Sequence, residues 1–153
     1  MINTAKDCYH SLERNQALVG VKVLVVDDDQ DSLDLTSFIL EACGVKVITA
    51  VSALDALEVI EQFQPQVLVS DIAMPQIDGN SLIRKIRQGK SLNHDIPAIA
   101  VTALDREEIF KLTLQSGFQA YLSKPFEGDE LIDLIVSLHL EKENREGLNA
   151  SAT

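Results

Sequence analysis

Residues 21–32 read VKVLVVDDDQDS, and this stretch decides the fold. Its first half, 21–26, is an almost unbroken β-branched and aliphatic run, which is typical of a strand buried on both faces of a parallel sheet. Three carboxylates, Asp27, Asp28 and Asp29, follow directly at the end of that run. Similar apolar runs recur further along the chain, at 45–49, 66–70, 97–101 and 120–122. The sequence therefore predicts five strands, and the first of them ends in a cluster of aspartates.

Segments with helical spacing separate the predicted strands. Apolar side chains at i, i+3, i+4 and i+7 mark one face of a helix. Such stripes, complete or shortened, occur at Leu35, Phe38, Ile39 and Ala42, at Ala53, Ala56, Leu57 and Ile60, at Leu82, Ile83 and Ile86, and at Leu131, Leu134, Ile135 and Leu138. The segment 105–115 is only weakly periodic. Five strands alternating with five helices predict a doubly wound α/β fold, a (βα)5 chain with a parallel sheet, right-handed crossovers and helices on both faces.

The composition is that of one ordinary globular domain. A chain of 153 residues can bury one core without disulfides, and its net charge of -11 without a basic stripe argues against a nucleic-acid partner. No apolar run approaches the roughly 18–20 residues that span a bilayer, and the N-terminus lacks the order of a secretory signal. Cys8 and Cys43 are isolated, which fits a reducing compartment. We expect a cytoplasmic protein that binds neither nucleic acid nor membrane.

The predicted domain occupies residues 21–140. Residues 1–20 have little patterning and are interpreted as a lead-in, and residues 141–153 as a loose C-terminal tail.

Side chains that can do chemistry stand at the ends of the predicted strands. Asp27 and Asp28 follow the first strand, and Asp71 ends the third. Sites in doubly wound sheets lie beyond the carboxyl ends of the strands, and these two strands are expected to be neighbours, so their carboxylates meet in one pocket. Their mutual repulsion requires a neutralising cation. Oxygen ligands without His or Cys suit a hard ion, and Mg²⁺ is the usual one.

The ends of the fourth and fifth strands add groups that can hold a phosphoryl group. The fourth strand ends in Thr102, and the fifth in Lys124 followed by Pro125. A carboxylate can act as the nucleophile, a metal and a lysine can neutralise phosphoryl oxygens, and a hydroxyl can donate a hydrogen bond.

At this point the chain resembles the receiver domains of two-component response regulators, over about residues 20–140. The segments that carry the resemblance are VLVVDDDQDS (23–32), VLVSDIAMPQIDG (67–79), AIAVTAL (98–104) and AYLSKPF (120–126). All four occur in order and at the expected strand ends, which makes the resemblance specific. It implies a flavodoxin-like fold with the five strands in the order 2-1-3-4-5.

The resemblance also implies roles for individual residues. Asp71 would be the phosphorylated residue. Asp28 and Asp71 would bind Mg²⁺ through their side chains and Ala73 through its carbonyl, with Asp27 acting partly through water.

Three further residues acquire roles in the same way. Thr102 and Lys124 would contact the phosphoryl group, and the Lys124–Pro125 bond would be cis. Tyr121 would be the aromatic residue whose rotation accompanies the switch.

The sequence resembles the receivers attached to hybrid histidine kinases more closely still. Leu18 and Gly20 of the lead-in, SDIAMPQIDGNSLIRKIR (70–87) and GFQAYLSKP (117–125) all look like that subgroup. Tyr121 departs from it, because the subgroup often has histidine there, and an aromatic phenol keeps the switch of the wider family plausible.

The function implied is that of a phosphorelay switch. A histidine kinase or phosphotransfer protein would phosphorylate Asp71, and an unidentified effector would bind the altered surface. A homodimer through the face of the fourth helix, fifth strand and fifth helix is a further option. The domain would catalyse only its own phosphorylation and dephosphorylation, so we do not expect an enzyme.

Other interpretations of these residues stay open. Asp27 and Asp29 match the D-x-D spacing of haloacid-dehalogenase phosphatases. The chain could also be a pseudo-receiver that takes no phosphate, or a module that works tethered to a kinase. Asp29 and Asp31 suit capping of the first helix better than metal binding. Asp78–Gly79 is interpreted as a turn, and the three histidines as surface residues.

Overall fold

The computed structural model describes residues 16–90, 93–104 and 106–151. Cys8, His10 and most of the predicted lead-in lie outside these residues. Strands and helices alternate along the described chain as β1 (Lys22–Val26), α2 (Gln30–Glu41), β2 (Lys46–Ala50), α3 (Ala53–Phe63), β3 (Val67–Asp71), α4 (Gly79–Gln88), β4 (Ala98–Thr102), α5 (Glu107–Ser116), β5 (Ala120–Ser123) and α6 (Gly128–Ser151).

The five strands form one parallel sheet in the order β2-β1-β3-β4-β5, so the predicted fold class and strand order are confirmed. The register pairs Val26 of β1 with Ser70 of β3, and Asp71 with Val101 of β4. Thr102 in turn pairs with Ser123 of β5. The carboxyl ends of β1, β3, β4 and β5 therefore lie side by side at one edge of the sheet.

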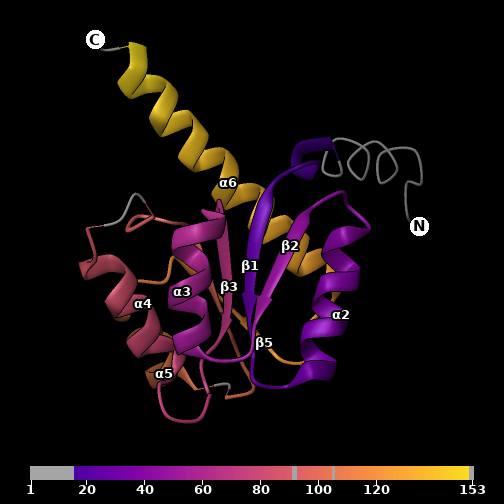
Figure 1. The fold of residues 1–153 in the computed structure, drawn as a ribbon, viewed down its shortest axis with the longest axis vertical. Coiled ribbons are helices and arrows are strands. Elements are labelled where there is room, and N and C mark those ends of the chain that lie inside the picture. The colour runs from indigo at the N-terminus through magenta and orange to yellow at the C-terminus, as the bar shows by residue number, and fades with distance from the viewer. Residues whose placement is uncertain (1–15, 91–92, 105, 152–153) are drawn as a thin grey trace.

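Helices cover both faces of this sheet and enclose two apolar cores (Figure 1). Helices α2 and α6 pack on one face through buried side chains such as Leu33 and Leu131, which contact inward residues of the strands. Helices α3 and α4 pack on the other face through residues such as Ile60 and Ile83. Because the central strands are buried on both sides, β3 and β4 contain no exposed residue, as their mostly apolar runs predict.

The apolar stripe that marks α2 in the sequence is mostly exposed, although the helix itself lies where its periodicity placed it. Leu35 and Phe38 of the predicted stripe are 61% and 73% exposed. The buried positions are Leu33, Thr36 and Leu40, which form a second stripe with the same spacing. Helix α2 thus carries apolar residues on two faces, and periodicity alone does not decide which face meets the sheet.

The C-terminus also differs from expectation, because residues 141–151 continue helix α6 rather than forming a loose tail. Figure 1 shows α6 running past the end of the sheet. Lys142 Nζ lies 3.4 Å from the Asp95 carboxylate in the loop before β4, and this contact ties the extension to the domain. Among the described helices, none combines the length and apolar character that crossing a membrane requires.

Candidate phosphoacceptor site

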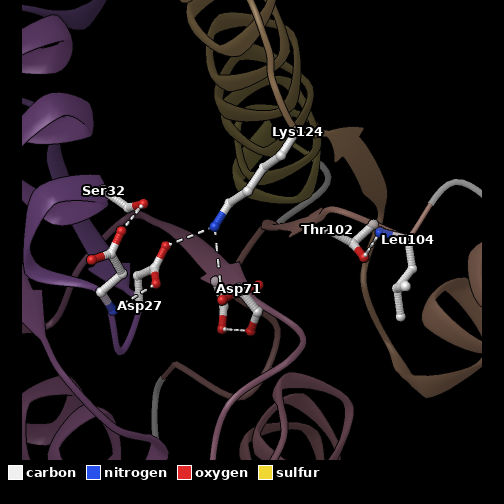
Figure 2. A network of polar contacts seen from close by, with 8 residues as sticks. Asp27, Ser32, Asp71, Thr102, Leu104 and Lys124 are labelled. Carbon is white, nitrogen blue, oxygen red and sulfur yellow. Dashed lines mark hydrogen bonds and ion pairs between the residues drawn. The ribbon is translucent and has the colours of Figure 1, made fainter.

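Four strand ends bring the predicted site residues together. Asp27 follows β1, Asp71 is the last residue of β3, Thr102 is the last of β4, and Lys124 follows β5. Asp27 and Asp71 are only 6% and 8% exposed, and Thr102 is fully buried. The ends of these strands therefore hold all four side chains at one edge of the sheet (Figure 2).

Three carboxylates share this edge. One oxygen atom from each of Asp27, Asp28 and Asp71 lies within 4.8 Å of the other two, and Asp28 is the exposed member. Asp29 is not a member of this cluster. Its carboxylate accepts a hydrogen bond from Ser32 Oγ at 2.8 Å in the first turn of α2, at the N-cap position but without a side-chain bond to the backbone. An all-oxygen cluster of this size fits a hard divalent cation such as Mg²⁺.

Lys124 is the cation that the protein itself places among these carboxylates. Its Nζ donates a hydrogen bond to Asp27 Oδ2 at 3.0 Å and lies 3.8 Å from Asp71 Oδ2. Figure 2 shows its side chain reaching down between the two. Burial lowers the pKa of Lys124, but the bond to Asp27 and the charge of Asp71 outweigh it and raise the pKa above its usual value. The following bond to Pro125 is cis, as the resemblance implied.

One lysine does not neutralise the cluster. Burial raises the pKa of Asp71 to about 6, and the charges of Asp27 and Asp28 add to this. Lys124 and the backbone N–H of Ala73 lower the pKa, but by less. The Asp71 carboxylate is therefore short of positive charge, which a metal ion bound to the same oxygens would supply.

Thr102 makes a local bond in the turn after β4. Its Oγ1 accepts a hydrogen bond from the backbone N–H of Leu104 at 3.0 Å (Figure 2). The hydroxyl therefore shapes the turn after β4.

Tyr121 does not join the pocket. Its ring stacks on Phe110 of α5, with centroids 3.9 Å apart and planes 8° from parallel, and the residue is 38% exposed. Phe110 was not among the predicted site residues, because its segment has only weak periodicity. An aromatic residue one turn into that helix was the available signal.

Gly79 has a structural role that differs from the predicted turn. It begins α4, and a Cβ atom there would lie 2.4 Å from the carbonyl oxygen of Asp71 and 2.9 Å from Ile72 Cα. Glycine is thus required for close approach of α4 to the end of β3, while Asp78 caps the helix by accepting from Ser81 N at 2.8 Å.

The histidines divide between surface and interior. His94 is exposed, as predicted. His139 is only 6% exposed, with its Nε2 3.3 Å from Glu143, so its predicted surface position is wrong.

A cavity of about 450 Å³ opens beside the carboxylates. It runs between α2 and the loop after β5, and its apolar lining includes Leu35, Ile39 and Phe126. Asp27, Asp71 and Lys124 form its polar end.

Comparison with known proteins agrees with this geometry. The family model of the response regulator receiver domain matches residues 23–136. An uncharacterised 14.6 kDa protein of Leptolyngbya boryana is 46% identical over 120 residues, which cover 78% of this chain and 91% of that protein. The polar-differentiation response regulator DivK of Brucella ovis is 31% identical over 115 residues, 75% of this chain and 93% of DivK.

Solved structures give the same result. A CheY-like receiver domain protein from Methanospirillum hungatei superposes with a TM-score of 0.76 and 31% identity, covering 82% of this chain and 98% of that one. The receiver domain of Francisella response regulator 1452 gives a TM-score of 0.74 and 35% identity, covering 80% and 99%. With the family match spanning most of the chain, this protein belongs to the receiver domains of two-component response regulators.

Proposed function

We propose that Asp71 accepts a phosphoryl group from a phosphohistidine in a reaction that requires Mg²⁺. The observation that carries this proposal is the position of the Asp71 carboxylate. It ends a buried strand, shares its pocket with Asp27 and Asp28, and has Lys124 3.8 Å away. A nucleophile for a phosphoryl group needs such neighbours, because negative charge accumulates as the transferring oxygens approach.

The metal would be held by residues that fit it. Asp28 and Asp71 would contribute carboxylate oxygens and Ala73 its carbonyl, with Asp27 assisting through water. When bound, Mg²⁺ supplies positive charge to the phosphoryl oxygens. Asp28 and Ala73 are exposed, so this side of the cluster is open to solvent and to the ion.

The transfer itself needs little more than positioning. An oxygen of ionised Asp71 attacks phosphorus in line with the P–N bond of the donor. The P–O bond forms as the P–N bond breaks, and its electron pair stays on the imidazole nitrogen. Lys124 neutralises a phosphoryl oxygen, and Thr102 donates a hydrogen bond through its O–H, which the bond accepted from Leu104 N leaves free.

The donor is proposed to be a histidine kinase or phosphotransfer protein that docks on α2. Leu35 and Phe38 are exposed apolar residues on this helix, and Leu35 also lines the cavity that ends at Asp71. A partner that covers this surface would bring its histidine to the same edge of the sheet.

The output is proposed to be a change in partner binding at another surface. Leu104, Leu114 and Tyr121 are partly exposed apolar residues on or beside α5 and β5. An effector or a second copy of the domain, meeting the α5–β5–α6 face, could cover them. We place the protein in the cytoplasm, where such kinases present their phosphohistidines, and treat its self-dephosphorylation as part of the signal rather than as enzyme activity.

The test uses a small donor, so that no kinase has to be known. Incubation with acetyl phosphate and Mg²⁺ should add one phosphoryl group to the intact mass, and peptide mapping should place it on Asp71. Asp71→Asn, which keeps the shape of the side chain, should take none.

Two other outcomes would support rival functions. A parent protein that stays unmodified would be a pseudo-receiver. Sustained turnover of a generic phosphate ester, with phosphate on Asp27, would indicate a phosphatase. Whether the domain works alone or tethered to a kinase leaves the chemistry at Asp71 unchanged.

A further inference from the structure

The two ends of the α4–α5 interface are held very differently. At the C-terminal end, Arg84 donates to Ser116 Oγ at 3.2 Å, and Arg87 donates twice to the Gly117 carbonyl, at 3.0 and 2.8 Å. Arg87 also bonds the His94 carbonyl and the side chain of Gln119. A network of charge-assisted bonds therefore fixes the C-terminal end of α5 to α4 and to the start of β5.

About one turn before these bonds, each of the two helices contains a buried polar atom without a partner. Asn80 Oδ1 and Thr113 Oγ1 have no hydrogen-bond partner, and the two residues are 4% and 0% exposed. Asn80 lies one turn before Arg84 in α4, and Thr113 lies one turn before Ser116 in α5. Residues three or four apart share a helix face, so Asn80 and Thr113 belong to the faces that Arg84 and Ser116 join.

An aromatic contact joins the first turns of α5 to the sheet. Glu107 and Glu108 are exposed, and the N-cap residue Arg106 makes no side-chain cap bond. The stacking of Phe110 on Tyr121 is the ring contact that joins this part of α5 to β5. It holds the Tyr121 ring outside the pocket.

We propose that α5 pivots about its fixed C-terminal end and that a hydrogen bond between Asn80 and Thr113 stabilises the second position. Buried polar atoms are nearly always paired in a stable packing, so two orphans across one interface mark a packing that can be improved. The pivot opens the Phe110–Tyr121 stack as it closes the polar pair. This inference rests on the proposed phosphorylation of Asp71, which biases the two packings through Thr102 and the loop after it.

The test is a double-mutant cycle measured in two states. Thr113→Val keeps the branched shape and removes the hydroxyl, and Asn80→Ala removes the amide. Binding of beryllofluoride with Mg²⁺, as a mimic of the phosphoryl group, should weaken roughly fivefold in each variant, which is the value of about one hydrogen bond. The double variant should lose no more affinity for beryllofluoride than either single variant loses. Urea unfolding without the mimic should show no coupling between the two sites.

The matched control is Ser37→Ala. Ser37 Oγ on α2 is a third buried polar atom without a partner among the described residues, so its removal separates the general effect of deleting such an atom from an effect on the switch. We expect Ser37→Ala to bind beryllofluoride like the parent protein. Acetyl phosphate should still modify Asp71 in Thr113→Val, because Thr113 lies outside the pocket.

The outcomes distinguish a failure of the polar pair from a failure of the proposed phosphorylation of Asp71. Parent-like binding by Thr113→Val and Asn80→Ala would overturn the polar pair while leaving phosphorylation of Asp71 intact. Equal coupling in both states would also overturn it, since the contact would then be static. A parent protein that binds no beryllofluoride would overturn both proposals. Independently of the mimic, amides 111–113 of the resting protein should exchange faster than amides 114–117, and equal protection would contradict a fixed C-terminal end.

Discussion

Lys124 Nζ donates a hydrogen bond to Asp27 Oδ2 at 3.0 Å, closer than its 3.8 Å approach to Asp71. The single lysine of the pocket is therefore engaged mainly by a residue that we do not propose as the phosphoacceptor. The negative charge of Asp71 is therefore only partly compensated, and burial raises the pKa of its carboxyl to about 6. The resting pocket is set to accept further positive charge, and several measurable properties follow from that.

Asp71→Asn should stabilise the metal-free protein at pH 7. The pKa of Asp71 rises from 3.8 to about 6 on folding, so the folded state binds the proton more tightly. Stability from this group is therefore present below pH 4 and is lost as the pH rises through 6. The neutral amide avoids this loss, and we expect a gain of about 1–2 kcal/mol at pH 7.

The measurement is urea unfolding with a chelator present, at several pH values between 4 and 7.5. The advantage of Asp71→Asn over the parent should shrink steadily below pH 6. A difference that stays constant across this range would show that the ionisation of Asp71 does not destabilise the fold.

Mg²⁺ should raise the melting temperature of the parent and not that of Asp28→Ala. At ten times the dissociation constant, mass action adds about 1.4 kcal/mol, or about 3–5 °C for a domain of this size. Glu41→Ala, which removes an exposed carboxylate outside the cluster, is the control and should respond like the parent. An Asp28→Ala variant that still binds Mg²⁺ and takes phosphate would contradict the ligand assignment.

Gly79→Ala should damage both stability and the site. The added Cβ would meet backbone atoms of Asp71 and Ile72, which cannot move without shifting the end of β3. We expect a loss of about 2–3 kcal/mol and slower phosphorylation. Gly147→Ala is the matched control, because no atom lies within 4 Å of its Cβ and alanine favours the helix by up to about 1 kcal/mol. Equal unfolding free energies for the two variants would refute the steric argument.

Phe38→Ala should separate a protein donor from a small one. The ring is 73% exposed, so its loss should change the free energy of unfolding by less than about 0.5 kcal/mol. If α2 receives the phosphohistidine protein, transfer from that protein should slow at least tenfold, while labelling by acetyl phosphate stays unchanged. Val19→Ala, at 68% exposure outside α2, is the control. Unchanged transfer from the protein donor would move the docking surface elsewhere.

The fold could be predicted because its signals are strong and local. Each strand is a mostly apolar run, and the boundaries of β2, β3 and β4 differ from prediction by one residue. The face of α2 could not be predicted, because two apolar stripes share one helix. The helical extension of α6 to Ser151 was missed since it has little apolar periodicity.

The location of the candidate site could be predicted from the strand ends, because parallel strands bring their last residues together at one edge of the sheet. Lys124 and Asp71 lie in one pocket as expected. The bond from Lys124 to Asp27 and the stack of Tyr121 on Phe110 depend on side-chain orientation, which residue spacing does not encode. Gly79 was read as a turn because a clash with the Asp71 carbonyl appears only in three dimensions.

Thr102→Ala should uncouple phosphorylation from its effect on α5. In the resting protein Thr102 Oγ1 accepts a hydrogen bond from Leu104 N, and movement of this oxygen toward a phosphoryl group would weaken that bond. The turn after β4 would then loosen, and Tyr121 could move away from Phe110 into the space behind β4. Without the hydroxyl, acetyl phosphate should still label Asp71, but the structural change should be confined to the pocket and should not reach α5.

Hydrogen exchange with and without beryllofluoride measures this coupling directly. In the parent, protection should change over 102–104, 106–115 and at Tyr121, because the turn and α5 repack together. Thr102→Ala should blunt the response, whereas Thr102→Ser keeps the hydroxyl and should retain most of it. A full response in Thr102→Ala would show that the signal reaches α5 by another route. A parent response confined to the loop after Asp71 would instead direct signalling through that loop or through phosphotransfer, because α5 would then have a single packing in both states.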